Sequence, residues 1–492
     1  MSLRLFSCYF SVSTFLFLAA CNSQQSTSSE RQYSEQAIKG KQLSEKYCIS
    51  CHLHPDPSLL NKESWKSVLP VMQREINKSL PISVFDWMAI EDYYNEASPS
   101  ELEKISSDEP KEITSQFKEQ PLIGLPKDLN PNLTLVKYFS DDKMLCLGND
   151  QGELFLLHNK TENKVRINNI PIDVDFNHET KEIIALGIGN IYPSQDKKGE
   201  LISIDSAGNS HTIIDSLIRP VHFSKHDFNS DGQGDFLISS FGSLGKIYYG
   251  KLSLYISFKG KFKEQIIKEL PGAIKTVIGD FNNDKQPDII ALFSQGRESI
   301  IIFLNKGDLK FEEKLIAEFP PVYGTNNFTL ADINNDSYPD IISTNGDNGD
   351  FSQVFKSYHG VRILINDGNN KFEEKYFFPI NGASKVIADD FDKDNDIDLT
   401  ILASYPNLKD RPQETLVYLE NSGDLNFNSS YIEKQPSGKW LLMDAGDLDN
   451  DGFPDLIVGA NLMNTIGQPE FYEQQWKTNK KSILILKNMG EG

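Results

Sequence analysis

Two periodicities of hydrophobic residues divide the chain. In the N-terminal part the apolar residues recur at helical spacing, and in the segment 80–98 they include Val84, Trp87, Met88 and Tyr94. Further along, short apolar runs alternate with polar turn segments, which is typical of β-strands joined by tight connections. The pattern predicts an all-α domain over 33–97, a charged linker over 98–111 and a mainly β domain over 112–492.

The β domain contains an internal repeat. Five nonapeptides with Asp at positions 1, 5 and 9 and Asn or Asp at position 3 begin at Asp227, Asp280, Asp332, Asp390 and Asp447. We call them the first to fifth Asp-rich loops. Their starts differ by 53, 52, 58 and 57 residues, and each loop precedes an apolar run typical of a buried strand. A period of about 55 residues is close to that of a four-stranded propeller blade, whereas helical repeat units are shorter.

Two further blades precede these five. A segment beginning at Asp175, 52 residues before Asp227, keeps the phase of the repeat but has Ile183 at its ninth position, so a metal site there is not expected. The segment 133–157 alternates between apolar and polar residues and lacks the loop entirely. The sequence therefore predicts a seven-bladed β-propeller in which five blades carry an Asp-rich loop.

The last blade is one strand short. In three blades a Phe on the outer strand precedes a Pro by nine residues: Phe262 and Pro271, Phe311 and Pro320, Phe427 and Pro436. The chain ends soon after the strand-like run 482–487, and the missing signal occurs instead at Phe117 and Pro126. Because an unpaired strand edge is unfavourable, we predict that 116–123 completes the seventh blade by pairing with 482–487. The alternative is a linker with a chance likeness to Phe262.

The Asp-rich loops offer oxygen atoms at alternating positions, and this arrangement suits Ca²⁺ better than Mg²⁺. Metal-free Asp and Asn turns are the alternative, although clustered carboxylates repel one another without a cation. Together with Gly-containing hairpins that place Asn six residues before Phe, the loops resemble the FG-GAP and VCBS families of propeller repeats. The predicted ligands are Asp227, Asn229, Asp231, Asp235, Asp280, Asn282, Asp284, Asp288, Asp332, Asn334, Asp336, Asp340, Asp390, Asp392, Asp394, Asp398, Asp447, Asp449, Asp451 and Asp455.

The acidic composition fits this interpretation. Five bound Ca²⁺ ions would change the formal net charge from −21 to −11, so much of the acidity would serve internal ligation. The remaining negative charge disfavours a nucleic acid partner, because phosphates would be repelled.

The helical segment contains a C-x-x-C-H motif at Cys48, Cys51 and His52. Redox dithiols, zinc half-sites and covalent haem attachment all use this cysteine spacing. A zinc site would need a second pair of ligands, and a thioredoxin-like site would need a βαβ context, but the sequence provides neither. An exported chain with this motif between helices fits the attachment of haem c.

The helix–motif–helix arrangement resembles a minimal class I cytochrome c domain. The resemblance implies thioether bonds from Cys48 and Cys51, axial ligation by His52 and a downstream Met as the sixth ligand. Met72, expected in a loop after Pro70, is the favoured candidate. Met88 and an open coordination position are the alternatives, and Met88 is expected in the core of an amphipathic helix.

The N-terminus indicates export. Arg4 precedes an apolar run over 5–20 that is too short and too polar to form a stable membrane span. The run ends in "LAAC", which resembles a bacterial lipobox and implies a signal peptide over 1–20 and acylation of Cys21; an ordinary secretory signal is the alternative. A Ser/Gln-rich tether follows over 21–32. We expect a protein of the cell envelope, held on a membrane only by this lipid and facing the periplasm or the cell surface.

Three functions fit these features. Covalent haem favours electron transfer, with the propeller docking a redox partner protein or an extracellular polymer. Since FG-GAP propellers resemble the integrin α-chain head, a calcium-dependent adhesion or glycan-binding module with an accessory haem domain is the second. The third is a haem-coupled periplasmic oxidoreductase with its active site on the propeller axis. No catalytic residues stand out, and the tryptophan signature of quinoprotein dehydrogenases is missing, since the chain has only Trp65, Trp87, Trp440 and Trp476.

Overall fold

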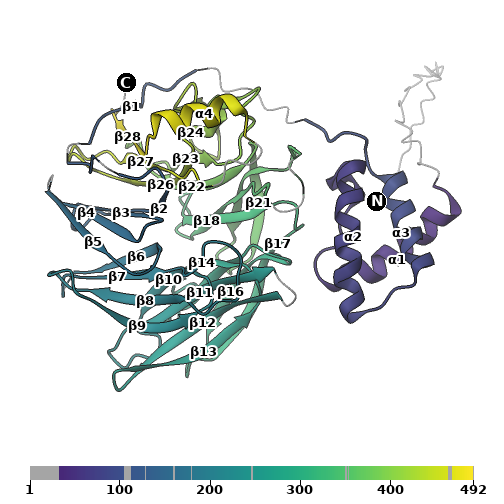
Figure 1. Ribbon diagram of the computed structural model, residues 1–492, viewed down its shortest axis with the longest axis horizontal. Helices are drawn as coiled ribbons and strands as arrows, with labels where there is room; N and C mark the ends of the chain where they lie inside the picture. Colours follow the sequence, from purple (N-terminus) through teal and green to yellow (C-terminus); the bar gives the residue numbers. More distant parts are fainter. Residues whose placement is uncertain are drawn as a thin grey trace, which may run out of the picture.

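A small helical domain lies beside a much larger β domain in the computed structural model (Figure 1). The structure describes residues 33–104 and 112–490, except 123, 128, 159–160, 179, 245–247, 350–351, 353 and 464–467. The predicted signal peptide, Cys21 and the tether therefore lie outside the described residues. Within the described part, none of the helices combines the length and the apolar character that a membrane span requires.

The helical domain consists of α1 (Glu35–Tyr47), α2 (Lys62–Ser79) and α3 (Val84–Ala97), with 3₁₀ turns at Cys48–Ser50 and Pro57–Leu59. A side-chain oxygen caps the N-terminus of each helix and accepts a backbone N–H of its first turn; the caps are Ser34, Asn61 and Ser83. These caps define where the helices begin.

A close helix crossing and buried aromatic residues hold the helical domain together. At Gly40 in α1 an added Cβ would lie 1.8 Å from the Ala89 carbonyl oxygen in α3, so only glycine permits this approach. The core beside the crossing contains Trp65, Trp87, Ile90 and Tyr94, all buried. The prediction that Met88 lies in this core is wrong, because its side chain is 50% exposed.

The β domain is a seven-bladed propeller of four-stranded antiparallel sheets, as predicted. The first three blades are built from β2 (Leu133–Phe139), β3 (Met144–Asn149), β4 (Glu153–His158) and β5 (Thr161–Arg166); β6 (Pro171–Asn177), β7 (Glu182–Gly187), β8 (Gly199–Ile204) and β9 (Ser210–Leu217); and β10 (Pro220–His226), β11 (Asp235–Leu244), β12 (Tyr248–Phe258) and β13 (Lys261–Glu269).

The next three blades follow in the same order, and neighbouring blades bury apolar side chains between them. Their strands are β14 (Ala273–Gly279), β15 (Asp288–Phe293), β16 (Glu298–Asn305) and β17 (Phe311–Phe319); β18 (Thr325–Ala331), β19 (Asp340–Asn345), β20 (Gly360–Asn366) and β21 (Phe372–Pro379); and β22 (Ala383–Asp389), β23 (Asp398–Ala403), β24 (Leu416–Asn421) and β25 (Phe427–Tyr431), with a 3₁₀ turn at Pro412–Thr415 before β24.

The seventh blade joins the two ends of the propeller. It contains β26 (Trp440–Gly446), β27 (Asp455–Ala460), β28 (Ile483–Asn488) and, as its outer strand, β1 (Phe117–Glu119). The predicted pairing is present, although β1 is shorter than the expected strand 116–123. Phe117 pairs with Asn488, and its buried ring lies 5.6 Å from that of Phe391. The ring of blades is therefore closed by backbone hydrogen bonds between distant parts of the chain.

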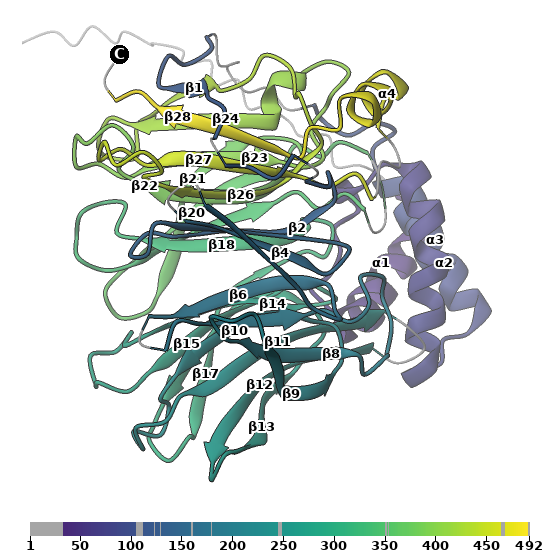
Figure 2. The same ribbon diagram turned by 60° about the vertical axis from the view of Figure 1, so that its left-hand side comes forward.

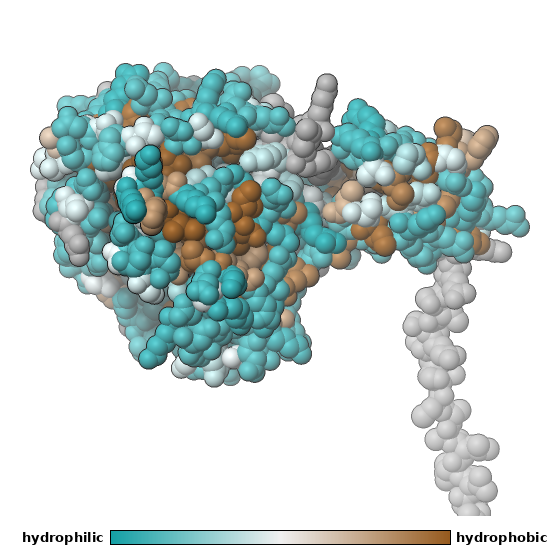
Figure 3. Space-filling model, turned by 90° about the horizontal axis from the view of Figure 1, so that it is seen from below, coloured by the Kyte–Doolittle hydropathy of each residue, from teal (hydrophilic) through white to brown (hydrophobic). Residues whose placement is uncertain are grey.

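One helix in the propeller was not predicted. It is α4 (Glu470–Asn479), which lies between β27 and β28 and buries Tyr472 and Trp476. Figure 2 shows α4 at the rim of the seventh blade, on the side of the helical domain. Seen from below, the helical domain projects from one side of the propeller, and hydrophilic residues cover most of the visible surface (Figure 3).

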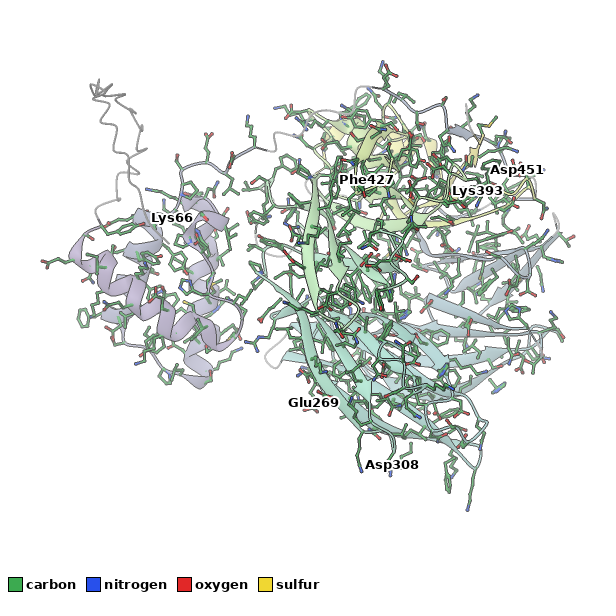
Figure 4. The ribbon with its side chains drawn as sticks, turned by 180° about the vertical axis from the view of Figure 1, so that it is seen from behind. Lys66, Glu269, Asp308, Lys393, Phe427 and Asp451 are labelled. Atoms are coloured by element: carbon green, nitrogen blue, oxygen red, sulfur yellow. The ribbon has the colours of Figure 1, made fainter. Side chains whose placement is uncertain are left out.

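The two faces of the propeller carry different features. In an antiparallel blade, the loops after the first and third strands lie on one face, and the loop after the second strand lies on the other. The Asp-rich loops follow the first strands, so all five share one face. Figure 4 shows Lys393 and Asp451, from the fourth and fifth loops, on the side away from the helical domain, which carries Lys66. The Asp-rich loops and the helical domain therefore occupy opposite faces.

Candidate functional site

A cavity of about 660 Å³ lies between the helical domain and the propeller, and we call it the interdomain cavity. One wall comes from the helical domain between Cys48 and Ile76. The other wall comes from three propeller loops, 270–271, 294–298 and 320–322. Its volume lies within the range of about 300–1,000 Å³ that is usual for small-molecule and cofactor sites.

All four residues predicted to hold haem line this cavity: Cys48, Cys51, His52 and Met72. The two cysteines are free thiols and do not form a disulfide. Cys48 follows directly after α1 and is buried, and this burial raises the pKa of its thiol to about 12. Both cysteines therefore line the cavity as unpaired thiols.

The imidazole of His52 is oriented by the backbone. Its Nδ1 lies 2.6 Å from the carbonyl oxygen of Leu53. A carbonyl oxygen can only accept a hydrogen bond, so Nδ1 donates and Nε2 keeps its lone pair, which is the tautomer that ligates a metal through Nε2. Burial lowers the pKa of His52, and the neutral ring is favoured. This donor set fits the axial ligation expected of a C-x-x-C-H histidine.

Met72 lies in a helix, and the prediction of a loop after Pro70 is wrong. Proline normally disfavours a helix interior because it lacks the N–H group. Here α2 continues through Pro70, since its Asn61 cap and the buried Val68 and Ile76 hold the helix on both sides. Met72 is half-buried against the helical core and reaches the cavity wall.

Met88, the alternative sixth ligand, is half-exposed on α3. It does not occur among the described residues that line the interdomain cavity. The structure therefore brings Met72, and not Met88, together with the C-x-x-C-H motif.

A loop between β19 and β20 connects the two domains. The Tyr358 hydroxyl donates to the Leu59 carbonyl oxygen at 2.7 Å, and Ser64 Oγ lies 2.9 Å from Ser352 Oγ. The Tyr358 ring stacks on Tyr323 with the centroids 4.6 Å apart, next to the 320–322 wall. Sequence analysis missed this contact, although the long interval between β19 and β20 was a signal that could have indicated a docking loop.

Glu298 fixes the propeller wall of the cavity. Its buried carboxylate accepts hydrogen bonds from the Thr325 N–H and from Thr325 Oγ1, both at 2.8 Å. Burial raises the pKa of Glu298 well above its usual range. These bonds tie the 294–298 loop to β18, so two neighbouring blades form a single wall.

The Asp-rich loops share one hydrogen-bond pattern. The ninth-position Asp is buried in every loop, and its Oδ2 accepts the N–H of the second residue. Its Oδ1 accepts, at 2.8 Å in each case, the N–H of a residue on the third strand of the blade: Ser257, Asn305, Asn366, Asn421 and Asn488. The ninth Asp therefore anchors the loop to its blade, a role that the sequence did not indicate.

The loops differ in how closely their carboxylates approach one another. Among the described residues, three carboxylates have oxygen atoms within 4.8 Å of one another in the fourth loop (Asp390, Asp392 and Asp394) and in the fifth (Asp447, Asp449 and Asp455). The predicted ligands of the first three loops do not form such a group in the described part of the chain.

The fourth loop fits a hard cation best. Asp390 Oδ1 is buried and has no hydrogen-bond partner among the described residues, so an oxygen atom in this loop lacks a positive neighbour. In the fifth loop, the Lys487 ammonium already contacts Asp449 and lies 3.0 Å from Asp451 Oδ2. Burial, together with nearby carboxylates, raises the pKa of Asp455 to about 6 and that of Asp398 to about 7.

Calcium removal gives a testable prediction. If the loops bind Ca²⁺ only in the folded state, a chelator should lower the melting temperature. A free Ca²⁺ concentration of 100 times Kd adds about 2.7 kcal/mol per site to the free energy of unfolding, and the chelator removes this contribution. Asp392→Asn should reduce this calcium-dependent increment, whereas Asp424→Asn, at an exposed hairpin position of the same blade, should not. Differential scanning calorimetry with and without calcium measures the effect, and identical melting curves would show that the loops are metal-free turns.

Comparisons with known proteins agree with the propeller. The family model of the FG-GAP-like repeat matches residues 280–343. Integrin alpha-8 of Gallus gallus is 24% identical over 229 residues, covering 43% of this chain and 22% of the integrin. A T-cell immunomodulatory protein homolog of Plasmodium falciparum (isolate 3D7) is 26% identical over 256 residues, covering 40% of this chain and 34% of that protein.

The matches span about a fifth to a third of the length of these curated relatives, 22% and 34% respectively. Among solved structures, the WD40 domain of Neurospora crassa Pan2 has a TM-score of 0.46 at 12% identity, with 78% of this chain and 99% of that chain covered. The N-terminal domain of Nup159 has a TM-score of 0.42 at 12% identity, with the same coverage. The chain thus contains an FG-GAP repeat within a seven-bladed propeller, and 43% of it is similar to integrin alpha-8.

Proposed function

We propose that the protein is an exported c-type cytochrome that transfers electrons and is anchored to a membrane through Cys21. Its calcium-braced propeller would dock a redox partner protein or an extracellular polymer. The observation that carries this proposal is that Cys48, Cys51, His52 and Met72 all line one cavity of cofactor size. Three of these residues are close in sequence, but Met72 is brought to them only by the packing of α2.

Each residue of the cavity has a distinct task in this proposal. Cys48 and Cys51 would hold haem c through thioether bonds, and His52 Nε2 and the Met72 sulfur would provide the axial ligands. Bound haem supplies reversible one-electron chemistry. Trp65, Val68 and Val71 contribute apolar surface to the same cavity, and this surface excludes water and tunes the potential.

The test is expression in cells that mature c-type cytochromes. The purified protein should carry one haem that survives acid–acetone extraction, that dithionite reduces and that ferricyanide reoxidises. A colourless protein from such cells, produced beside a coloured reference cytochrome, would overturn the proposal.

Met72→Ala provides a finer test of the axial ligand. Because Met/His ligation raises the potential, its loss should lower the midpoint potential by roughly tenths of a volt, within the span of about 0.8 V that axial ligands set. The weak charge-transfer band of the oxidised Met-ligated form should disappear as well. The control is Met88→Ala on the exposed face of α3, which should leave both properties unchanged. The opposite result for the two variants would assign the ligand to Met88.

A calcium-dependent ligand-binding propeller with an accessory haem domain is the second candidate. The FG-GAP repeat and the similarity to integrin alpha-8 favour it. The two candidates differ in what partner binding requires. In the second, binding should depend on calcium and persist when Cys48 and Cys51 are both replaced, whereas electron transfer to the partner should be lost in that double variant.

A further inference from the structure

A second cavity lies where the helical part of the chain meets the propeller, and we call it the Phe355 cavity. Its volume is about 440 Å³, within the range of about 300–1,000 Å³ that is usual for small-molecule sites. The chain before the propeller contributes Asn61 and the segment 101–104 to its wall. The propeller contributes 354–357, Asn381 and part of the loop 407–411. None of its described lining residues belongs to the Asp-rich loops or lines the interdomain cavity.

Phe355 provides the cavity with an aromatic wall. It lies in the loop between β19 and β20 and is 43% exposed, so a large part of its apolar surface has no protein neighbour. The neighbouring Lys356 fixes the loop. Its ammonium group donates to the Ser352 carbonyl oxygen at 2.8 Å and to the Val354 carbonyl oxygen at 3.1 Å. The backbone that positions the ring is therefore held in place without a ligand.

Asn381 places an unsatisfied amide group on the same wall. It lies between β21 and β22 and is only 5% exposed. Its buried Oδ1 has no hydrogen-bond partner among the residues that the structure describes. A buried acceptor without a donor is unfavourable, so a ligand hydroxyl that donates to this oxygen would stabilise the site. The χ2 torsion of asparagine is broad, so the carboxamide can turn toward a ligand.

The charges on the wall of the Phe355 cavity are balanced. The described lining contains three acidic and three basic residues: Glu101, Glu103, Asp410, Lys104, Lys356 and Arg411. Two of them already have partners, since Asp410 Oδ2 accepts from Asn407 Nδ2 at 3.1 Å and Arg411 Nη1 donates to Glu414 Oε1 at 3.0 Å. The lining thus carries no net formal charge and offers both donors and acceptors, which favours a neutral ligand with hydroxyl groups.

We propose that the Phe355 cavity binds a neutral sugar. A sugar ring combines an apolar face of C–H groups with a rim of hydroxyl groups, which can both donate and accept hydrogen bonds. The apolar face packs against the Phe355 ring, and one hydroxyl group donates to Asn381 Oδ1. The polar side chains of Asp410 and Arg411 lie on the same wall and are available to further hydroxyl groups.

The sugar site is separate from the two sites described above. The loops 354–357 and 407–411 follow the second strands of their blades, so they lie on the face opposite the Asp-rich loops. The site therefore requires neither calcium nor haem. Its failure would leave the proposed electron transfer unaffected, and sugar binding that persists without calcium would distinguish it from a calcium-dependent ligand site.

The test is saturation-transfer NMR on the full chain, in which aromatic protons of the protein are irradiated and the signals of a dissolved sugar are observed. The neutral probes are cellobiose, maltose and D-galactose, and D-galacturonate is the charged comparison for D-galactose. We expect at least one neutral sugar to receive saturation on its ring C–H protons, with and without a calcium chelator. D-Galacturonate should not bind more tightly than D-galactose.

Phe355→Ala locates the binding in this cavity. It removes the aromatic surface and should weaken the binding of the sugar by about tenfold or more. Phe471→Ala is the matched control, because Phe471 is 66% exposed on α4 and does not occur among the described residues that line the cavity. This control should bind the sugar with unchanged affinity.

Asn381→Leu separates sugar binding from folding. Leucine leaves no unsatisfied acceptor, so the melting temperature without sugar should not fall. The variant should nevertheless bind the sugar about tenfold more weakly or worse, because a ligand hydroxyl loses its acceptor. In differential scanning calorimetry, the sugar should raise the melting temperature of the unaltered protein more than that of the variant.

Several results would overturn the proposal. Absence of saturation for all three neutral sugars excludes the ligand class, and tighter binding of D-galacturonate than of D-galactose excludes a neutral ligand. Loss of binding in the chelator would move the sugar to the calcium-dependent face. Unchanged affinity in Phe355→Ala or in Asn381→Leu would exclude this cavity. If Phe355→Ala does not fold, Asn381→Leu alone decides.

Discussion

Replacing Cys48 and Cys51 together by serine is expected to give a colourless protein in cells that mature c-type cytochromes. The reason is that both cysteines line the interdomain cavity and would form the covalent attachment, whereas a serine hydroxyl forms no thioether. The loss should be complete and is measured by visible absorption before and after acid–acetone extraction. Each single replacement should retain haem through one remaining bond.

Cys146→Ser is the matched control for this experiment. Cys146 is a buried free cysteine in β3 of the propeller, so the chemical change is the same but the location differs. This variant should keep its haem even if the propeller becomes less stable. Extraction-resistant colour in the double variant would show that Cys48 and Cys51 do not attach the group, and circular dichroism should confirm that α1, α2 and α3 are still folded.

Removing β1 is expected to produce the second large effect. A chain that begins at Glu112 keeps Phe117 and the ladder to β28, and it also keeps the bonds of Glu112 and Thr114 to the Tyr431 backbone. A chain that begins at Asn130 loses all of these. Burial of Phe117 alone is worth about 3–5 kcal/mol, by analogy with Phe→Ala substitutions in protein cores. The shorter chain should therefore melt at a lower temperature.

Loss of β1 also leaves the backbone of β28 unpaired at an open edge. Such edges pair with other chains, so the shorter protein should aggregate in a concentration-dependent manner. Phe117→Ala in the chain that begins at Glu112 separates the two causes, because it removes the ring but keeps the backbone ladder. Equal melting temperatures and equal solubility of the two truncated chains would show that the pairing contributes nothing.

The blades could be predicted because the same pairing of strands recurs from blade to blade. Phe117 pairs with Asn488 in the same way that Phe311 pairs with Asn305 and Phe427 with Asn421. In those blades the Asn side chain accepts an N–H of the hairpin turn. The Asn–Phe spacing is thus the mark of one hairpin geometry, and its incomplete copy at Asn488 indicated a missing strand. The nine-residue spacing between Phe and Pro then located that strand at Phe117, more than 300 residues away from its partner.

The elements that were missed occur once and have no repeat to reveal them. Helix α4 lies in the interval between Ala460 and Ile483, and its only periodic signal is the buried pair Tyr472 and Trp476, one helical turn apart. Met72 was misplaced because Pro70 is a strong local signal for the end of a helix. The packing of Val68 and Ile76 overrode this signal, which local sequence patterns do not report.

The composition of the candidate sites could be predicted only in part. The C-x-x-C-H motif predicts haem c from the sequence alone, which stays a prediction, and the propeller wall of the cavity comes from residues such as Glu298 that lie far away in the chain. Likewise, the five Asp-rich loops are nearly equivalent in sequence. They differ in how closely their carboxylates approach one another and in neighbouring charges such as that of Lys487. Tertiary contacts of this kind leave no local pattern.

The pairing of β1 with β28 also determines which domain can fold first during protein synthesis. Phe117 leaves the ribosome 371 residues ahead of Asn488, and at about 5–20 residues per second this delay lasts about 20–75 s. The ring cannot close in that interval, whereas the helical domain, whose contacts are mostly local, can fold first. If the exported chain crosses the membrane with its N-terminus first, Cys48 and Cys51 would likewise be open to an attaching enzyme before the propeller covers that side. The timing of covalent attachment would thus be built into the chain order.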